Sequence, residues 1–544
     1  MKSSTTASPL LRLFGLCALA AGTAVLADTI EVTLPISGVE RWSRTNEYVL
    51  NKFIYVLAGA ELHIEAGTVV KGKPGKDADT SALIVTAGGK IFAEGTPTQP
   101  IIFTAEADDV TDPDDLGIFE RGLWGGVLLL GKASLNTATS AEGNAATPKY
   151  EVFEGLPDTV VNGQHVHRFG GSDDDDSSGV FRYVSIRHAG VVFQPNKELN
   201  GMTLGGVGRG TTVEYVETYA AADDGFEFFG GTVNTKYLVS AFNDDDAFDV
   251  DQGWRGKNQF WFAIQEPGKK DNGGEWNGEP NGAAANNTPI ANYEIYNATW
   301  IGAGTNTAGN RGLTVREYAA PKLYNSILTQ FGGNAVSIDD KSKTHLDSGL
   351  LDLRDNLFWN FATNGVAVPL NANANAAVLF TDAARNNRNA DPLLRGVSRT
   401  NDGRLDPRPA QDSPALTSVR TAPQDGFYHP VQWTGAFRAM NWASDWTFLA
   451  AKGVLTAQGA GNPLPAPAAS VVAEAPDVSA VLLDGQIELA FPTVVGVSYQ
   501  PQTRSGLGEG TWANEGTAIS GTGSPASVKF PVTGDARFFR ITVD

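Results

Sequence analysis

The chain has 544 residues, and 61 acidic against 41 basic side chains give it a formal charge of −20. Such an acidic chain repels phosphate backbones, so we expect no nucleic-acid partner. One cysteine, Cys17, excludes a disulfide framework. The chain is long enough to bury a large core. Its 61 glycines and short β-branched runs favour many strands and tight turns.

Residues 1–27 are predicted to be a signal peptide. Lys2 and Arg12 precede a short apolar run that ends in the small-residue pattern Val25-Leu26-Ala27. Cleavage before Asp28 removes the only cysteine and moves the formal charge from −20 to −22. No later apolar stretch approaches the length of a membrane span, so we expect a secreted chain without a transmembrane segment, outside the cell, at its surface or in the periplasm.

Residues 180–253 contain an internal repeat with an offset of 22 residues. Tyr215 and Tyr237 hold equivalent places, and Asp223-Asp224-Gly225-Phe226-Glu227 recurs as Asp245-Asp246-Ala247-Phe248-Asp249. One such coil cannot bury its own apolar face, so successive coils must stack. The repeat predicts an all-β fold, a right-handed parallel β-helix. Further along, Asn297, Asn325 and Asn356 follow similar segments and are expected to stack at one turn.

Segments at both ends of this region resemble a known family. Leu62–Val70 and Leu83–Thr104 are similar to the opening coils of secreted bacterial β-helix proteins of the pectate-lyase-like superfamily. Leu405–Ala415 and Gly435–Thr447 resemble the last segments of a largely uncharacterised group of these proteins. The resemblance implies a β-helix over residues 28–460. It implies no single activity, because the superfamily holds lyases, hydrolases, adhesins and structural proteins.

The chain ends in a separate small module. Residues 461–476 are rich in proline and alanine and form a predicted linker. Residues 477–544 contain short alternating apolar runs, which predict a small β-sandwich-like module.

Stacking the repeats places carboxylates above one another. Neighbouring coils are about 4.8 Å apart, and two like charges at that distance repel by roughly 3 kcal/mol at an effective dielectric near 20. A bound hard cation would relieve this repulsion, and Ca²⁺ takes six to eight oxygen ligands in flexible geometry. The alternative is that these acids are solvated turn residues. The predicted metal ligands are Asp223, Asp224, Glu227, Asp245, Asp246 and Asp249.

A second candidate calcium loop is Asp174-x-Asp176-x-Ser178-Gly179. It matches the first half of a calcium-binding loop, but Ser185 occupies the twelfth position where such a loop has Glu. The acidic run is equally consistent with a solvated loop.

The resemblance also implies candidate catalytic groups. In calcium-dependent polysaccharide lyases of the superfamily, an Arg or Lys removes the proton beside the substrate carboxylate, and the matching candidates are Arg255 and Lys257. An Arg beside acidic residues is also a common ion-pair partner. A glycoside hydrolase would instead use acids such as Asp224 and Asp246. The candidates for substrate binding are Arg187, His188 and, as part of a sugar-stacking platform, Trp254, although tryptophans also fill β-helix cores.

Two hypotheses follow for function. The first is a calcium-stabilised extracellular or surface protein that binds a polysaccharide, a surface glycan or another partner. The second is a carbohydrate-active enzyme, a calcium-assisted lyase or a glycoside hydrolase, that uses the Asp-rich pair of coils. The sequence carries no complete catalytic motif, which favours the first.

Overall fold

A computed structural model describes most of the chain. The described residues are 28–137, 149–194, 197–279, 286–363, 366–367, 373–417, 419–457, 478–483, 486–493, 498–504, 512–520, 525–531 and 538–543. The predicted signal peptide and the predicted linker lie outside them. They form two compact units, one containing residues up to 420 together with 433–462, and the other containing 421–432 and 463–544.

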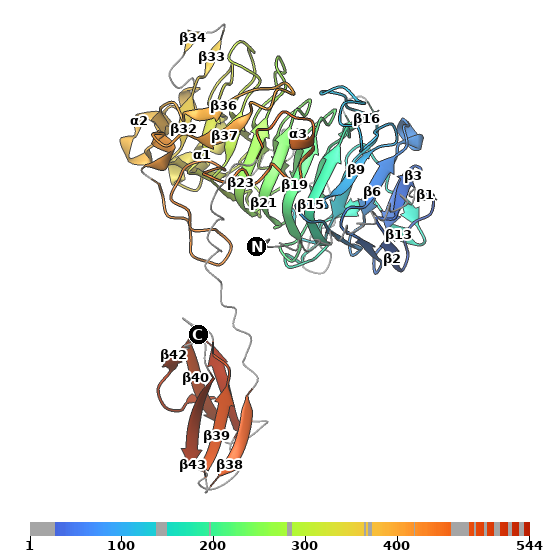
Figure 1. Cartoon of the computed structure of the whole chain (residues 1–544). Coiled ribbons are helices and arrows are strands. Elements are labelled where there is room, and N and C mark those ends of the chain that lie inside the picture. The colour runs from blue at the N-terminus through green and yellow to red at the C-terminus, as the bar shows by residue number, and fades with distance from the viewer. Residues whose placement is uncertain are drawn as a thin grey trace, which may run out of the picture. The chain divides into compact units, whose positions relative to one another are not determined.

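The first unit is a parallel β-helix, as predicted from the repeat. Consecutive coils run along its axis in chain order, as the colour gradient in Figure 1 shows. One long wall, sheet A, is made of parallel strands. Its strands are β1 (Asp28–Val32), β2 (Val39–Trp42), β3 (Asn46–Leu50), β5 (Glu61–Ile64), β6 (Val69–Gly72), β8 (Lys90–Glu94), β9 (Ile101–Ala105), β15 (Gly179–Arg187), β19 (Thr212–Tyr219), β21 (Asn234–Ala241), β23 (Lys257–Ile264), β25 (Glu294–Tyr296), β26 (Thr299–Ile301), β28 (Lys322–Tyr324), β29 (Ile327–Thr329), β31 (Asp352–Arg354), β32 (Leu357–Trp359) and β35 (Arg388–Asn389).

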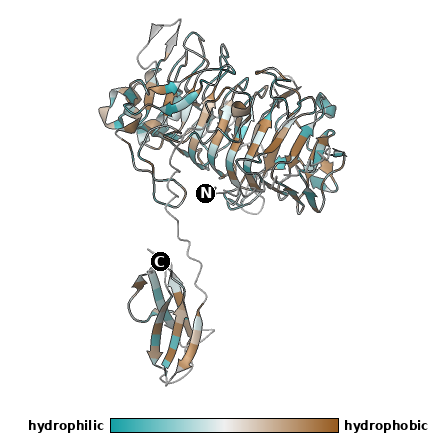
Figure 2. Cartoon of the chain, viewed as in Figure 1, coloured by the Kyte–Doolittle hydropathy of each residue, from teal (hydrophilic) through white to brown (hydrophobic). Residues whose placement is uncertain are grey.

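A second parallel wall, sheet B, carries the candidate site. Its strands, in spatial order, are β4 (Phe53–Val56), β7 (Ala82–Val85), β10 (Val127–Leu130), β18 (Met202–Gly205), β20 (Phe226–Phe229), β22 (Phe248–Asp251), β24 (Gly274–Asn277), β27 (Leu313–Arg316) and β30 (Val336–Ile338). Apolar side chains from both walls fill the space between them, and in Figure 2 the strands accordingly carry brown, apolar bands beside teal, hydrophilic ones.

The coils from β15 to β32 each bend at one residue of sheet A with a positive φ. In β15, β19 and β21 this residue is Tyr183, Tyr215 or Tyr237, with φ between 49° and 57°. A left-handed backbone costs roughly 1–2 kcal/mol at a non-glycine residue. Aromatic stacking offsets part of this cost, because the ring centroids of successive tyrosines are 4.3 Å and 4.1 Å apart. The predicted 22-residue register is therefore confirmed.

The predicted asparagine stack is wrong in its third member. Asn297 and Asn325 occupy the bend position of their coils with φ of 59° and 49°. Tyr324 pairs in register with Arg354, so Asp355, with φ of 59°, holds the next bend position in place of Asn356. The buried Asn356 instead donates from Nδ2 to the Leu323 carbonyl at 2.9 Å.

A C-terminal segment of the first unit, residues 433–457, returns to pack on sheet A. Its short helix α3 (Phe448–Ala451) lies against β19, and the buried Glu217 of β19 accepts hydrogen bonds from the backbone N–H groups of Phe448 at 2.6 Å and Leu449 at 3.0 Å. Lys452 Nζ donates to the Leu116 carbonyl at 2.7 Å. We call residues 433–457 the closing segment.

Shorter elements decorate the coils. They are the hairpin pairs β11 (Glu151–Val152) with β14 (Arg168–Phe169), β12 (Val160–Val161) with β13 (Gln164–His165), β16 (Val191–Gln194) with β17 (Lys197–Leu199), β33 (Ala362–Thr363) with β34 (Val366–Ala367), and β36 (Leu394–Gly396) with β37 (Asp406–Pro409), and the helices α1 (Asp340–Ser348), α2 (Val378–Thr381), η1 (Asp77–Asp79), η2 (Ala374–Ala376), η3 (Ala383–Arg385) and η4 (Pro414–Leu416). Among the residues that the structure describes, none of the helices is long and apolar enough to cross a membrane.

The C-terminal module consists of two antiparallel sheets. One contains β38 (Ser479–Leu483), β39 (Gln486–Phe491) and β43 (Ala526–Pro531), and the other contains β40 (Ser498–Arg504), β41 (Ala513–Asn514), β42 (Ile519–Ser520) and β44 (Phe538–Val543). A small core that includes Leu489, Phe491, Tyr499, Phe530 and Ile541 lies between them. This arrangement fits the predicted β module.

Candidate cation site

An acidic ladder crosses the outer face of sheet B. Phe226 and Phe228 of β20 point into the β-helix core, so Glu227 between them points outward. Glu227 pairs in register with Asp249 of β22, and Asp249 pairs with Glu275 of β24. Three acids thus lie directly above one another on three neighbouring coils.

The turns that precede β20 and β22 add a second set of acids. These turns stack through their backbones, since the Asp245 N–H donates to the Asp223 carbonyl at 3.4 Å and the Gly225 N–H donates to the Asp246 carbonyl at 2.9 Å. The Asp246 N–H also donates to Asp224 Oδ1 at 2.9 Å. The acid-over-acid stacking expected from the repeat is therefore present.

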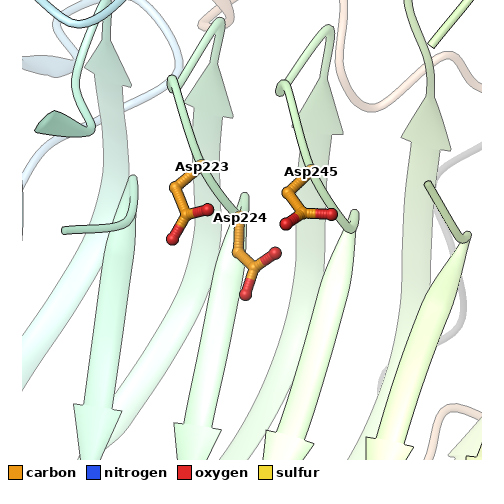
Figure 3. A group of neighbouring side chains, drawn as sticks. All are labelled: Asp223, Asp224 and Asp245. Carbon is orange, nitrogen blue, oxygen red and sulfur yellow. The ribbon is translucent and has the colours of Figure 1, made fainter. Parts of the chain in front are cut away.

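Two groups of three carboxylates have the spacing of cation sites. One contains Asp223, Asp224 and Asp245, and the other contains Asp224, Glu227 and Asp249; within each group the oxygens lie within 4.8 Å of one another. Asp224 belongs to both groups. Figure 3 shows its side chain between those of Asp223 and Asp245, which hang from neighbouring turns. The clustered acids could hold a metal ion.

Asp246 is the predicted ligand that joins neither group. It is 2% exposed, and its Oδ1 accepts hydrogen bonds from the backbone and the side chain of Asn272, the latter at 2.9 Å. Its carboxylate therefore orders the next turn. This also corrects its candidate role as a catalytic acid, because a buried carboxylate cannot reach a glycosidic bond.

Burial and mutual repulsion shift the titration of these acids. Burial, followed by the charges of Asp223, Asp249, Asp245 and Glu227, raises the pKa of Asp224 well above its usual value. The pKa values of Glu227, Asp246 and Asp249 are raised for the same two reasons. Although Asp245 as a residue is exposed, desolvation of its carboxyl and its contacts with Asp271 raise its pKa to about 7. Burial likewise raises the pKa of Asp251 to about 7.

The stacked charges on sheet A are arranged differently from those on sheet B. Its outer face carries two ladders in which the sign alternates from coil to coil. The first is Glu94, Arg182, Glu214 and Lys236, and the second is Lys257, Glu294, Lys322 and Asp352. Arg182 lies 3.5 Å from both of its acidic neighbours, and Lys322 lies 2.9 Å from Glu294. The chain thus balances stacked charges on sheet A by alternating their sign, whereas the ladder on sheet B stacks three acids, of which Glu275 forms an ion pair with Arg316.

The two candidate bases lie elsewhere. Arg255 donates from Nη2 to Asp174 Oδ2 at 2.9 Å and to Ser134 Oγ at 2.8 Å. It is an ion-pair partner, which corrects its candidate role as a base. Lys257 begins β23 and belongs to the alternating ladder of sheet A, in register with Glu294, so the structure does not bring it to the acidic ladder of sheet B.

The carboxylates of the second candidate calcium loop accept hydrogen bonds from other parts of the protein. Asp174 accepts from the Ser134 N–H at 3.0 Å as well as from Arg255, and Asp176 Oδ2 accepts from the Lys132 N–H at 3.0 Å. Through these hydrogen bonds, the two carboxylates connect the segment before β15 with the segment after β10.

Arg187 and His188 are buried beneath the closing segment. Arg187 is 4% exposed, and the Phe448 ring lies over its guanidinium at 4.2 Å. His188 is 0% exposed, and its Nδ1 lies 2.6 Å from the Glu120 carbonyl. The prediction that these two residues bind substrate is therefore wrong, because neither side chain reaches the surface.

Trp254 lies in the core rather than on a sugar-binding platform. It is 0% exposed, and its ring stacks on Phe228 with 4.1 Å between the centroids. Trp261, Trp276 and Trp300 are equally buried. The prediction of a sugar-stacking platform beside the acids is wrong. The alternative, that these tryptophans fill the core of the β-helix, is confirmed.

The sequence did not single out Glu275 and Asp271, which the structure adds to the acidic face. Asp249 and Glu275 are in register, but they are 26 residues apart because the coil between them is longer than the repeat. Aligning Phe248-Asp-Val-Asp251 with Gly274-Glu-Trp-Asn277 strand by strand could have found Glu275.

Comparison with known proteins agrees with the fold. A family model described as a pectate-lyase-like β-helix domain matches residues 36–392. No curated protein matches the chain. The matched range contains the coils that carry the acidic ladder. Because the match covers more than half of the sequence, the chain belongs to the family of pectate-lyase-like β-helix domain proteins.

Proposed function

We propose that this chain is an exported protein whose sheet B binds Ca²⁺ at the acidic ladder and, through the bound cations, an acidic polysaccharide. The observation that carries the proposal is the in-register stack of Glu227, Asp249 and Glu275. On sheet A the same chain alternates the sign of stacked charges. Glu275 forms an ion pair with Arg316 of β27. Glu227 and Asp249 form one carboxylate group with Asp224, and an external cation would balance the like charges of that group.

The chemistry of the two groups suits calcium. The ligands are carboxylate oxygens on neighbouring coils, which can adjust to a large ion with six to eight oxygens. Asp224 and Glu227 are each 7% exposed and form the inner side, while Asp245 is exposed. A cation held there keeps an open side, to which a uronate or sulfate group of a glycan can bind.

A second candidate function is glycoside hydrolysis, and the titration of Asp245 favours it. Its pKa of about 7 lets this exposed carboxyl keep its proton near neutral pH, as a general acid requires. The lyase version has less support, because Arg255 is held by Asp174 and Lys257 belongs to sheet A.

The test is the calcium dependence of glycan affinity. The mature chain is titrated with polygalacturonate, alginate and chondroitin sulfate, once with Ca²⁺ and once with EDTA. We expect Ca²⁺ to raise the affinity for at least one of these glycans and Asp249→Asn to remove that gain. Asp244→Asn is the matched control, because Asp244 belongs to neither group and pairs with Arg121 at 2.8 Å.

Equal affinities with Ca²⁺ and EDTA for every glycan would contradict the proposal. The same mixtures are assayed for new reducing ends. Their release by the wild-type chain and its loss in Asp245→Asn would support the hydrolase instead.

A further inference from the structure

The C-terminal module has an outward face that is unlike the rest of this acidic chain. In the sheet of β40, β41, β42 and β44, Tyr499 and Ile541 point into the module core. Gln502 pairs in register with Arg540 on one side and with Asn514 on the other. Since side chains alternate along a strand, these three residues lie on the outer face.

Two arginines on this face flank one tryptophan. The Cζ atoms of Arg504 and Arg540 lie 4.9 Å and 4.4 Å from the centroid of the Trp512 ring. Residues 477–544 contain four basic residues, and two of them are therefore gathered on a single aromatic ring. Stacking on an aromatic ring holds a guanidinium in a fixed plane, and a planar guanidinium fork matches carboxylate and sulfate groups.

A chain of hydrogen bonds orders the neighbouring amides. Arg540 Nε donates to Gln502 Oε1 at 2.9 Å, and Gln502 Nε2 donates to Asn514 Oδ1 at 2.8 Å. Planar polar side chains fixed in this way lose little entropy when a ligand binds. Guanidinium forks match carboxylate and sulfate groups, and amides match hydroxyl groups.

We propose that this face, made of Arg504, Trp512, Arg540, Gln502 and Asn514, is a binding site for an anionic polysaccharide. The two guanidinium groups bind its carboxylate or sulfate groups, and the amides bind its hydroxyls. Charge supports this location, because the rest of the chain is strongly acidic and repels a polyanion. The proposal does not depend on the cation site of sheet B.

The experiment measures binding of the whole mature chain to dextran sulfate, whose only anionic groups are sulfates, and to polygalacturonate, which supplies carboxylates. EDTA is present throughout, so a cation-dependent site contributes nothing. We expect binding to at least one of the two, and the stronger of them identifies the group that is recognised. The double variant Arg504→Gln with Arg540→Gln should bind at least roughly tenfold more weakly, as the loss of charge-assisted hydrogen bonds predicts.

Two further variants separate recognition from folding. Arg504→Lys with Arg540→Lys keeps both charges but not the forks, and it should bind with an affinity between those of the wild type and the double Gln variant. Lys529→Gln is the matched control, because Lys529 lies on the other sheet, 3.4 Å from Glu488, and should leave affinity unchanged. If the Gln variant fails to fold, judged by its circular dichroism, the Lys variant decides.

Three results would overturn the proposal. They are the absence of binding to either glycan, equal binding by the wild type and the variants that fold, and equal affinity for a DNA duplex, which would show attraction to any polyanion. Because EDTA is present, none of these results bears on the cation site.

Discussion

Asp224 is the residue whose replacement most directly tests the cation site, because both carboxylate groups share it. Each of its four acidic neighbours in these groups lies within 4.8 Å, at which distance two ionised carboxylates repel by about 3 kcal/mol at an effective dielectric near 20. Burial and this repulsion raise the pKa of Asp224, because both disfavour its charged form. Asparagine has nearly the same shape, removes the disfavoured charge and can still accept from the Asp246 N–H, so Asp224→Asn should not lower Tm in EDTA.

The effect appears when calcium is added. A ligand at one hundred times its Kd stabilises the folded state by about 2.7 kcal/mol per site. For a β-helix that spans residues 28–457, the entropy of unfolding is about 0.9 kcal/mol per kelvin. One occupied site should therefore raise Tm by about 3 °C, and two sites by about 6 °C. Asp224→Asn should lose the whole shift.

The assay is differential scanning calorimetry of the wild type, Asp224→Asn and Asp244→Asn, each with EDTA and with saturating Ca²⁺. Asp244 stands in the same turn as Asp245 but pairs with Arg121, so Asp244→Asn should keep the calcium shift even if its baseline Tm is lower. The reasoning is refuted if Asp224→Asn keeps the full shift, or if the wild type shows none.

Three other predictions concern the same fold. In EDTA, Tm should fall as the pH rises from about 4 to above 7 in a calorimetric pH series, because Asp245 and Asp251, with pKa values of about 7 against 3.8 for an ordinary aspartate, bind more protons folded than unfolded. Saturating Ca²⁺ should reduce this fall, because Asp245 belongs to one of the two carboxylate groups and Asp251 to neither. Glu217→Gln should lower the free energy of unfolding by about 2 kcal/mol, because the carboxylate that accepts from the Phe448 and Leu449 N–H groups is lost. The same variant should show faster hydrogen exchange at these two amides. Trp254→Ala should lower the free energy of unfolding, measured in urea, by about 3–5 kcal/mol because it empties part of the core, while glycan affinity is retained.

The two substitutions each have a control variant. Glu214→Gln removes a partly exposed acid of a sheet A ladder and should cost less than about 1 kcal/mol. Trp359→Ala removes a tryptophan that is 36% exposed and should cost far less than Trp254→Ala. A Tm in EDTA that rises with pH over the same range would contradict the raised pKa values.

The corrections share one cause. A repeat assigns each residue to a position in a coil. It does not show which other segments of the chain pack against that position. Arg187 and His188 occupy the end of β15 as the repeat implies, and they are buried because Phe448 returns from a distant part of the chain to lie over them. Arg255 follows the ladder closely in sequence, yet its partner Asp174 belongs to an earlier coil.

By itself, the sequence determined the parallel β-helix, the register of its central coils and the stacking of Asp223 to Glu227 on Asp245 to Asp249. It could do so because side chains at equal offsets in neighbouring coils must lie above one another. Only the tertiary structure decided that Asp224 is shared by two carboxylate groups, that Glu275 extends the ladder and that Trp254 is core. These facts depend on the direction of each side chain and on segments far apart in the chain, which a local repeat does not encode.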